Sequence, residues 1–123
     1  MSIELDQVSA GYNGFRLCDI SLTIAKGSFT ALIGPNGCGK STLLNTMARV
    51  LQAYQGTIHI GGNNIRTAKT NEIARLVTVL PQNPVVPPAI SVEQLVNYGR
   101  APHQNLLGLR SQTDRDAVEN ALH

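Results

Sequence analysis

A glycine-rich stretch, residues 34–42, constrains this chain more than any other part of its sequence. It follows the phosphate-binding pattern G-x-x-x-x-G-K-[ST] and reads Gly34-Pro35-Asn36-Gly37-Cys38-Gly39-Lys40-Ser41-Thr42. An apolar segment of strand length, Phe29–Ile33, precedes the stretch, and apolar residues at helical spacing follow it between Leu43 and Leu51. The sequence therefore predicts a strand, a glycine loop and a helix, which is the order that this motif requires.

The chemistry expected of this loop is the binding of a polyphosphate. A backbone with few bulky side chains can curl around phosphate groups and direct successive N–H groups at them. The helix N-terminus adds unpaired N–H groups and the positive end of its dipole. Lys40 is placed to reach the β- and γ-phosphates, and the Ser41 hydroxyl to join the shell of a Mg²⁺ ion. The alternative is a glycine-rich turn that matches the pattern by accident, but the correct flanking segments favour a nucleotide site.

The bulk properties indicate one folded domain of a cytosolic protein. Of the 123 residues, 42% are hydrophobic and 15% are charged, which favours a folded chain over a disordered one. The net charge is +2 and the basic residues are dispersed, so we expect no nucleic acid partner. We also expect no membrane span, no secretory signal and no disulfide framework from the two cysteines.

The pattern of apolar residues predicts short strands before the glycine loop and mixed structure after it. Before the loop, alternation at Ile3–Val8, Phe15–Cys18 and Leu22–Ile24 predicts an antiparallel sheet with tight turns. After it, we expect strands at Thr57–Ile60 and Leu76–Leu80, a short helix at Thr70–Arg75, and a proline-rich loop over residues 82–88.

Two helix starts follow the proline-rich loop. Ser91-Val92-Glu93-Gln94 is a capping box, and Thr113-Asp114-Arg115-Asp116 predicts the start of a second helix. No glycine or proline ends that second helix before His123. We therefore expect the beginning of a helix rather than the end of a domain; a short terminal helix is the alternative.

From Gly34 to Thr42, with Tyr12 ahead and Gln82 behind, the sequence resembles the ATP-binding-cassette (ABC) ATPases that power membrane transporters. The strings Thr30–Leu44, Leu80–Gln82 and Ser91–Arg100 are most similar to the importers of ferric siderophores, ferric citrate, haem and cobalamin. The resemblance covers essentially the whole chain. It implies an α/β P-loop NTPase fold, with an antiparallel β portion and the phosphate-binding strand and helix over residues 1–90. It implies the start of a helical subdomain over residues 91–123.

The resemblance also implies roles for individual residues. Tyr12 would stack on adenine, Thr42 would bond the α-phosphate, and Gln82 would approach Mg²⁺ and the attacking water. Lys40 and Gln82 would be the catalytic residues, and Ser41 and Gln82 the metal ligands. Taken alone, Tyr12 could be an ordinary turn tyrosine and Gln82 a polar loop residue. The ATP-binding set implied by the resemblance is Tyr12, Gly34, Pro35, Asn36, Gly37, Cys38, Gly39, Lys40, Ser41 and Thr42.

The partners implied by the resemblance are a membrane permease and a second nucleotide-binding subunit. The permease would contact the loop around Gln82. The protein would then be cytoplasmic and peripheral, held on the inner face of the cell membrane through the permease.

The chain departs from the family pattern in three places. It has no Leu-Ser-Gly-Gly-Gln type signature, no apolar strand that ends in Asp-Glu, and no later switch histidine. In P-loop enzymes the metal is held jointly by the loop hydroxyl and a carboxylate that follows a strand. The sequence therefore resembles the amino-terminal half of a nucleotide-binding domain, which contains the phosphate loop without that carboxylate.

These observations lead to one functional hypothesis and two alternatives. We expect the complete domain to hydrolyse ATP and to energise the import of a ferric siderophore-like ligand, with the chain of 123 residues inactive by itself. The alternative is a non-catalytic module that binds a nucleotide or phosphate. A small P-loop kinase or GTPase is disfavoured because the chain contains no Asn-Lys-x-Asp guanine motif and no basic cluster of the kind found in a lid.

Overall fold

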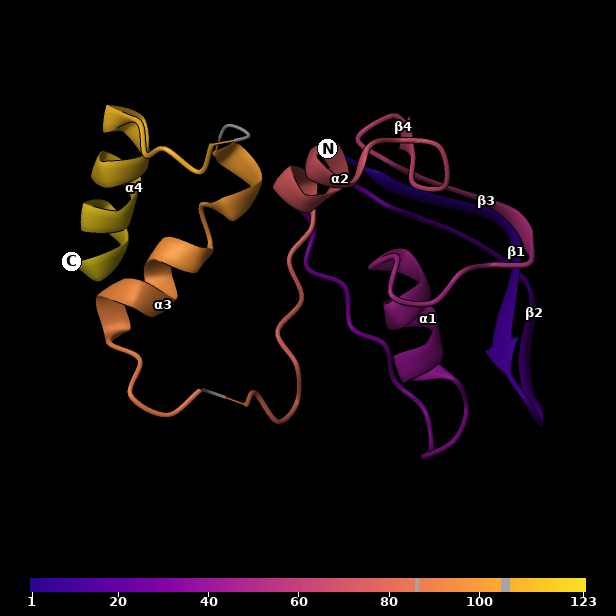
Figure 1. Cartoon of the computed structure of the whole chain (residues 1–123). Coiled ribbons are helices and arrows are strands. Elements are labelled where there is room, and N and C mark those ends of the chain that lie inside the picture. The colour runs from indigo at the N-terminus through magenta and orange to yellow at the C-terminus, as the bar shows by residue number, and fades with distance from the viewer. Residues whose placement is uncertain (86, 105–106) are drawn as a thin grey trace. The chain divides into compact units, whose positions relative to one another are not determined.

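The computed structural model describes residues 1–85, 87–104 and 107–123, so residue 86 of the predicted proline-rich loop lies outside the described residues. The described chain forms two units, Met1–Thr78 and Val79–His123. The first contains a β-sheet and two helices, and the second is helical (Figure 1). Of the helices in the described parts, none combines the length and apolar character needed to cross a bilayer. The predicted ranges 1–90 and 91–123 remain a prediction.

The sheet of the first unit is antiparallel throughout, as the alternation within residues 3–24 predicts for that part of the chain. Its strands are β1 (Ile3–Tyr12), β2 (Phe15–Ile24), β3 (Gln55–Ile60) and β4 (Asn63–Asn64), in the spatial order β2-β1-β3-β4.

Strand β2 is a single strand where the sequence predicts two. The register between β1 and β2 shifts on both sides of Val8, and Asp19 on β2 has a φ of 53°. The Ser9 hydroxyl accepts a hydrogen bond of 3.0 Å from the Asp19 N–H at this irregularity. An irregularity of this kind breaks the alternation of side chains without ending the strand, which explains why the pattern indicated two pieces.

The core of the first unit is formed by the sheet and by α1 (Lys40–Met47) and α2 (Thr70–Leu76). Leu43 and Met47 lie four residues apart on α1 and are both buried. Burial of such a side chain contributes about 1.5–3 kcal/mol, so this face stabilises the packing of α1 in the core. The buried cluster consists of Leu5, Val8, Leu43, Met47, Ile58, Ile60, Ile65 and Ile73.

Helix α1 ends at Met47, four residues before the predicted end of its apolar pattern. Arg49 adopts the left-handed conformation with a φ of 62°, and the N–H groups of Val50 and Leu51 both donate to the carbonyl of Asn45. A left-handed residue just after a helix satisfies its last carbonyls and stops it. The apolar residues beyond Met47 therefore belong to the connection to β3.

Two predicted strands, Phe29–Ile33 and Leu76–Leu80, are not strands in the structure. Leu76 is the last residue of α2, and residues 77–80 and 29–33 are irregular. Phe29, Ile33 and Leu80 are 97%, 93% and 89% exposed. A strand requires a hydrogen-bonded neighbour, and no strand among residues 1–85, 87–104 and 107–123 pairs with either segment. Their apolar, β-branched composition predicted strands without indicating what they pair with.

The second unit contains α3 (Val92–Tyr98), a short 3₁₀ helix (Ala101–His103) and α4 (Gln112–Leu122). The predicted capping box of α3 is confirmed, because the Ser91 hydroxyl accepts from the Gln94 N–H at 3.2 Å and the Gln94 carboxamide oxygen accepts from the Ser91 N–H at 2.8 Å. Helix α4 begins earlier than predicted. Its N-cap is Ser111, which forms a capping box with Asp114.

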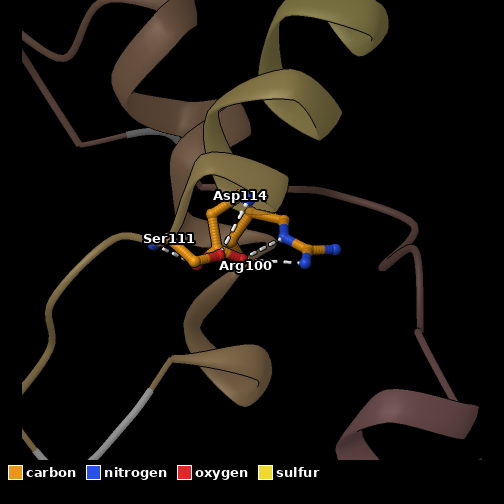
Figure 2. A network of polar contacts seen from close by, with 3 residues as sticks. All are labelled: Arg100, Ser111 and Asp114. Carbon is orange, nitrogen blue, oxygen red and sulfur yellow. Dashed lines mark hydrogen bonds and ion pairs between the residues drawn. The ribbon is translucent and has the colours of Figure 1, made fainter.

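Asp114 also joins the start of α4 to Arg100, which follows the C-cap of α3 (Figure 2). The Ser111 backbone N–H and hydroxyl each donate to Asp114 Oδ2 at 2.9 Å. Arg100 donates from Nε to Asp114 Oδ1 at 2.9 Å, and its Nη2 lies 2.8 Å from the same oxygen. The Ser111 backbone bond, and then the Arg100 guanidinium, lower the pKa of Asp114 to about 2.

The first prediction concerns this network, and the substitution is Asp114→Asn. Because the pKa of Asp114 is lower in the folded chain than in an unfolded one, the ionised carboxylate stabilises the fold above about pH 4. This contribution is lost as the pH falls toward 2. We therefore expect the variant to have a lower thermal midpoint and less helix at pH 7, and the difference to disappear near pH 2.

Circular dichroism of both proteins over this pH range measures the effect. Glu119→Gln removes an exposed charge from the same helix and serves as the control. A difference between Asp114→Asn and the original chain that is the same at every pH would contradict the network's electrostatic origin.

The second prediction concerns the exposed segment 29–33. An apolar, β-branched segment without a strand partner is a template for pairing with another chain. We expect the chain to self-associate with increasing concentration and Phe29→Lys to reduce that association. Static light scattering measures the association of both proteins. The control is Leu107→Lys, which changes an 80% exposed position in the second unit. A monomer at all concentrations would show that the segment does not recruit a partner.

Candidate functional site

Gly39 connects the glycine loop to helix α1 and to the sheet. It is the N-cap of α1, and its φ of 101° lies in the left-handed region that favours glycine. A Cβ at this position would lie 2.5 Å from Leu17 Cδ2 and 2.9 Å from Phe15 Cζ. The backbone conformation therefore favours glycine here, and a larger residue would also displace the side chains of Leu17 and Phe15. Sequence reasoning placed Phe15 and Leu17 on a strand but gave no indication that they support the loop.

Tyr12 belongs to the same end of the sheet. It is the last residue of β1 and pairs with Phe15, whose ring lies next to Gly39. The side chain of Tyr12 is 54% exposed, so its ring is accessible to a ligand. The structure thus connects Tyr12 to the loop through Phe15, and stacking on adenine remains a prediction.

The amine of Lys40 lies inside the loop. Its Nζ donates to the carbonyls of Gly34 at 2.7 Å and Pro35 at 2.8 Å, and lies 3.7 Å from Cys38 Sγ. A positive charge is therefore held against the backbone at the point where α1 begins. An anion that enters the loop would meet this charge directly.

The loop carries Cys38 close to Gly34. A Cβ on Gly34 would lie 2.7 Å from Cys38 Sγ, and the Cys38 N–H donates to the Pro35 carbonyl at 3.4 Å. A side chain at position 34 would displace the Cys38 thiol, so glycine lets the loop fold back on itself without that displacement. Residues 34–38 are all exposed, so a ligand has access to this backbone.

The N-terminus of α1 adds further groups that suit an anion. The first N–H groups of a helix have no partner within it, and the positive end of the helix dipole lies beside them. The first turn of α1 contains no acidic residue that would compete with an anion. The loop, Lys40 and this helix end are therefore suited to the phosphates of a nucleotide.

Ser41 and Thr42 differ in their environments. Ser41 is exposed, whereas Thr42 is buried, and its carbonyl accepts a 2.7 Å hydrogen bond from the Thr46 hydroxyl. Mg²⁺ keeps several waters and takes most of its other oxygens from phosphates, so the single accessible hydroxyl of Ser41 fits such an ion. Within the described residues, no group of three or more His, Cys, Asp or Glu side chains could hold a metal.

The structure groups some of the predicted site residues and not others. Tyr12 and residues 34–42 all belong to the first unit, where the contacts of Phe15 and Lys40 connect them. Gln82 is exposed and belongs to the second unit. Its predicted roles toward Mg²⁺, water and a permease therefore remain predictions.

Known proteins that are similar to this chain include ATP-binding proteins of iron transport. The iron(3+)-hydroxamate import ATP-binding protein of Bacillus subtilis is 42% identical over an alignment 123 positions long, which covers 98% of this chain and 45% of that protein. The ferric enterobactin transport ATP-binding protein of Escherichia coli is 39% identical over 118 residues, which are 95% of this chain and 44% of that protein. The chain therefore spans less than half the length of these relatives.

A solved structure and a family description agree with them. The ATP-binding subunit of an ABC transporter superposes with a TM-score of 0.75 at 25% identity, over 84% of this chain and 43% of that chain. This likeness supports the predicted P-loop α/β class. The family described as ABC transporter matches residues 17–123, which include the glycine loop and Gln82. The predicted resemblance is confirmed, and the chain belongs to the ABC transporter family.

Proposed function

We propose that this chain is the ATP-binding, amino-terminal part of the nucleotide-binding domain of an ABC importer. The observation that carries the proposal is the position of the Lys40 amine, which lies 2.7 Å from the Gly34 carbonyl inside a loop that leads into a helix N-terminus. Backbone N–H groups and a lysine at this place are suited to a nucleotide's phosphates. The family match supports ATP as that nucleotide.

The proposed cargo is a ferric siderophore-like ligand. The two relatives described above are named for the import of iron(3+)-hydroxamate and the transport of ferric enterobactin, which both contain ferric iron. Their shared chemistry supports this ligand class over the alternative, a nucleotide-binding module with no part in transport. The complete protein would work from the cytoplasmic face of the membrane, with a permease and a second nucleotide-binding subunit.

The proposed roles of the residues follow from their positions. Lys40 would place its charge on the β- and γ-phosphates, and the backbone of residues 34–39 would direct N–H groups at the same oxygens. The exposed ring of Tyr12 would lie against adenine, and Ser41 would provide a hydroxyl to Mg²⁺. The proposed bond from Thr42 to the α-phosphate rests on the family resemblance alone, because Thr42 is buried. When bound, Mg²⁺ neutralises charge on the phosphates.

Hydrolysis would require groups beyond those in residues 1–123. The eight carboxylates of the chain include no Asp-Glu pair, and none follows four consecutive apolar residues. We therefore propose that the chain binds ATP and that the complete domain, with Gln82 near Mg²⁺ and the attacking water, hydrolyses it. A phosphate-release assay on the chain separates binding alone from catalysis.

The third prediction tests the nucleotide site with Lys40→Ala. This change removes the cation held in the loop, and a hydrogen bond to a charged group contributes about 1.5–3 kcal/mol. We expect ATP affinity to fall at least about tenfold. Calorimetric titration measures it, with Lys26→Ala, in the exposed turn after β2, as the matched control. Equal affinity of Lys40→Ala and the original chain would show that the loop is not used.

The fourth prediction uses the two free cysteines, Cys18 and Cys38, which are both exposed. Cys38 lies within the loop, whereas Cys18 lies on β2. ATP bound in the loop would cover Cys38, so we expect nucleotide to slow its alkylation by N-ethylmaleimide and to leave Cys18 unaffected. Peptide mapping after a short pulse measures both sites at once. Labelling of Cys38 that is indifferent to ATP would mean that nucleotide does not occupy the loop.

A further inference from the structure

A cavity lies in the first unit, just beyond the C-terminal end of α1. Its volume is about 410 Å³, within the range of about 300–1,000 Å³ that is usual for small-molecule sites. It is lined by residues 49–53 after α1, by residues 56–58 of β3 and by residues 64–66. None of residues 34–42 lines it, so this cavity is distinct from the nucleotide site at the other end of α1.

One side of the cavity is apolar. Ile58 and Ile65 are buried, and the Ile65 N–H donates to the Ile58 carbonyl at 3.0 Å, which holds the two residues next to each other. Leu51 and Ala53 also line the cavity and are partly buried. Both isoleucines belong to the core cluster, so this wall is rigid and suited to the apolar body of a ligand.

The polar side of the cavity is positively charged. Arg49 and Arg66 line it, and its described lining residues include no Asp or Glu. The Arg49 guanidinium donates from Nη1 to the Ala68 carbonyl at 3.1 Å. Because a guanidinium has five N–H donors, this bond positions the group while other donors remain. A planar guanidinium matches the two oxygens of a carboxylate or phosphate.

The neighbouring Asn64 is also held in place. Its carboxamide oxygen accepts from the Arg66 N–H at 2.9 Å, which fixes the orientation of the amide. The carboxamide nitrogen is then available as a neutral donor in the same lining. Two cations and an oriented amide beside an apolar wall are a combination suited to a ligand that is both anionic and apolar.

The dipole of α1 explains the presence of only one of these two arginines. Arg49 follows the C-terminal end of α1, where a cation is stabilised by the helix dipole. Arg66 follows β4 and belongs to no helix, so that explanation does not apply to it. Arg49 moreover occupies a left-handed position, with a φ of 62°, that glycine or asparagine usually fills. The Arg49 side chain also donates to the Ala68 carbonyl, so structural roles account for Arg49 and leave Arg66 to be explained.

We propose that this cavity binds a small organic anion. The guanidinium groups of Arg49 and Arg66 hold its carboxylate or phosphate group, and its apolar body lies against Ile58 and Ile65. The site is separate from the proposed ATP site, because the two share no lining residue.

The test titrates phenyl phosphate and benzoate, in separate arms, into the full chain that carries Lys40→Ala. This background weakens binding at the glycine loop and leaves the cavity intact. We expect at least one anion to bind, with amide shifts in nuclear magnetic resonance spectra at residues 49–53 and 64–66. Arg66→Gln should weaken that binding at least about tenfold. The arm that binds more tightly identifies phosphate or carboxylate as the preferred head group.

Three controls make the outcome decisive. Arg16→Gln removes an exposed arginine from β2 and should leave the affinity unchanged. Benzyl alcohol, which has the apolar body without the charge, should bind at least about tenfold more weakly than the anion. Arg49→Gln should weaken anion binding in the same way as Arg66→Gln. If Arg49→Gln disturbs the end of α1, the affinity of Arg66→Gln alone tests the proposal. The proposal is overturned by equal binding of benzyl alcohol, by unchanged affinity in Arg66→Gln, or by no binding of either anion.

Discussion

The contact between Gly39 and the side chains of β2 is the constraint on which the site depends. Gly39 has a φ of 101°, which favours glycine, and a Cβ there would lie 2.5 Å from Leu17 Cδ2, so a larger residue would strain the loop and displace the Leu17 side chain. This contact places the N-terminus of α1 beside Phe15, and Phe15 pairs with Tyr12. The ring proposed for adenine and the lysine proposed for the phosphates are thus positioned by one packing contact.

Local patterns predicted the parts of the fold that depend on local interactions. The antiparallel hairpins, the helix after the glycine loop and the capping box at Ser91 all depend on residues close together in the chain. The N-cap of α4 was placed wrongly, at Thr113-Asp114, because Ser111 and Thr113 are both cap formers and only the contact of Ser111 with Asp114 distinguishes them. The motif likewise predicted residues 34–42, whereas the support from Phe15 comes from packing between β2 and a loop that is distant in the chain.

The segments 29–33 and 77–80 show the limit of such reasoning. Their composition is that of buried strands, but a strand exists only when another backbone supplies its hydrogen bonds. Within the described residues nothing pairs with them, so Phe29 and Ile33 are exposed. Composition predicts what a segment can form, and pairing determines what it does form. The arginine-lined cavity was also not predicted, because residues 49–53 and 64–66 come together only in the folded unit.

The two hydrogen bonds from Lys40 to its own loop have a consequence for the energetics of recognition. A lysine side chain loses about 2 kcal/mol of rotamer entropy when it is immobilised. Here the carbonyls of Gly34 and Pro35 already hold the amine, so much of that entropy is lost during folding rather than on ligand binding. When a phosphate binds, the Lys40 amine exchanges neutral carbonyl acceptors for charged phosphate oxygens, and its side chain is already ordered. The loop is in this sense preorganised. Its affinity for a phosphate reflects the difference between the hydrogen bonds of Lys40 to phosphate oxygens and those to the two carbonyls.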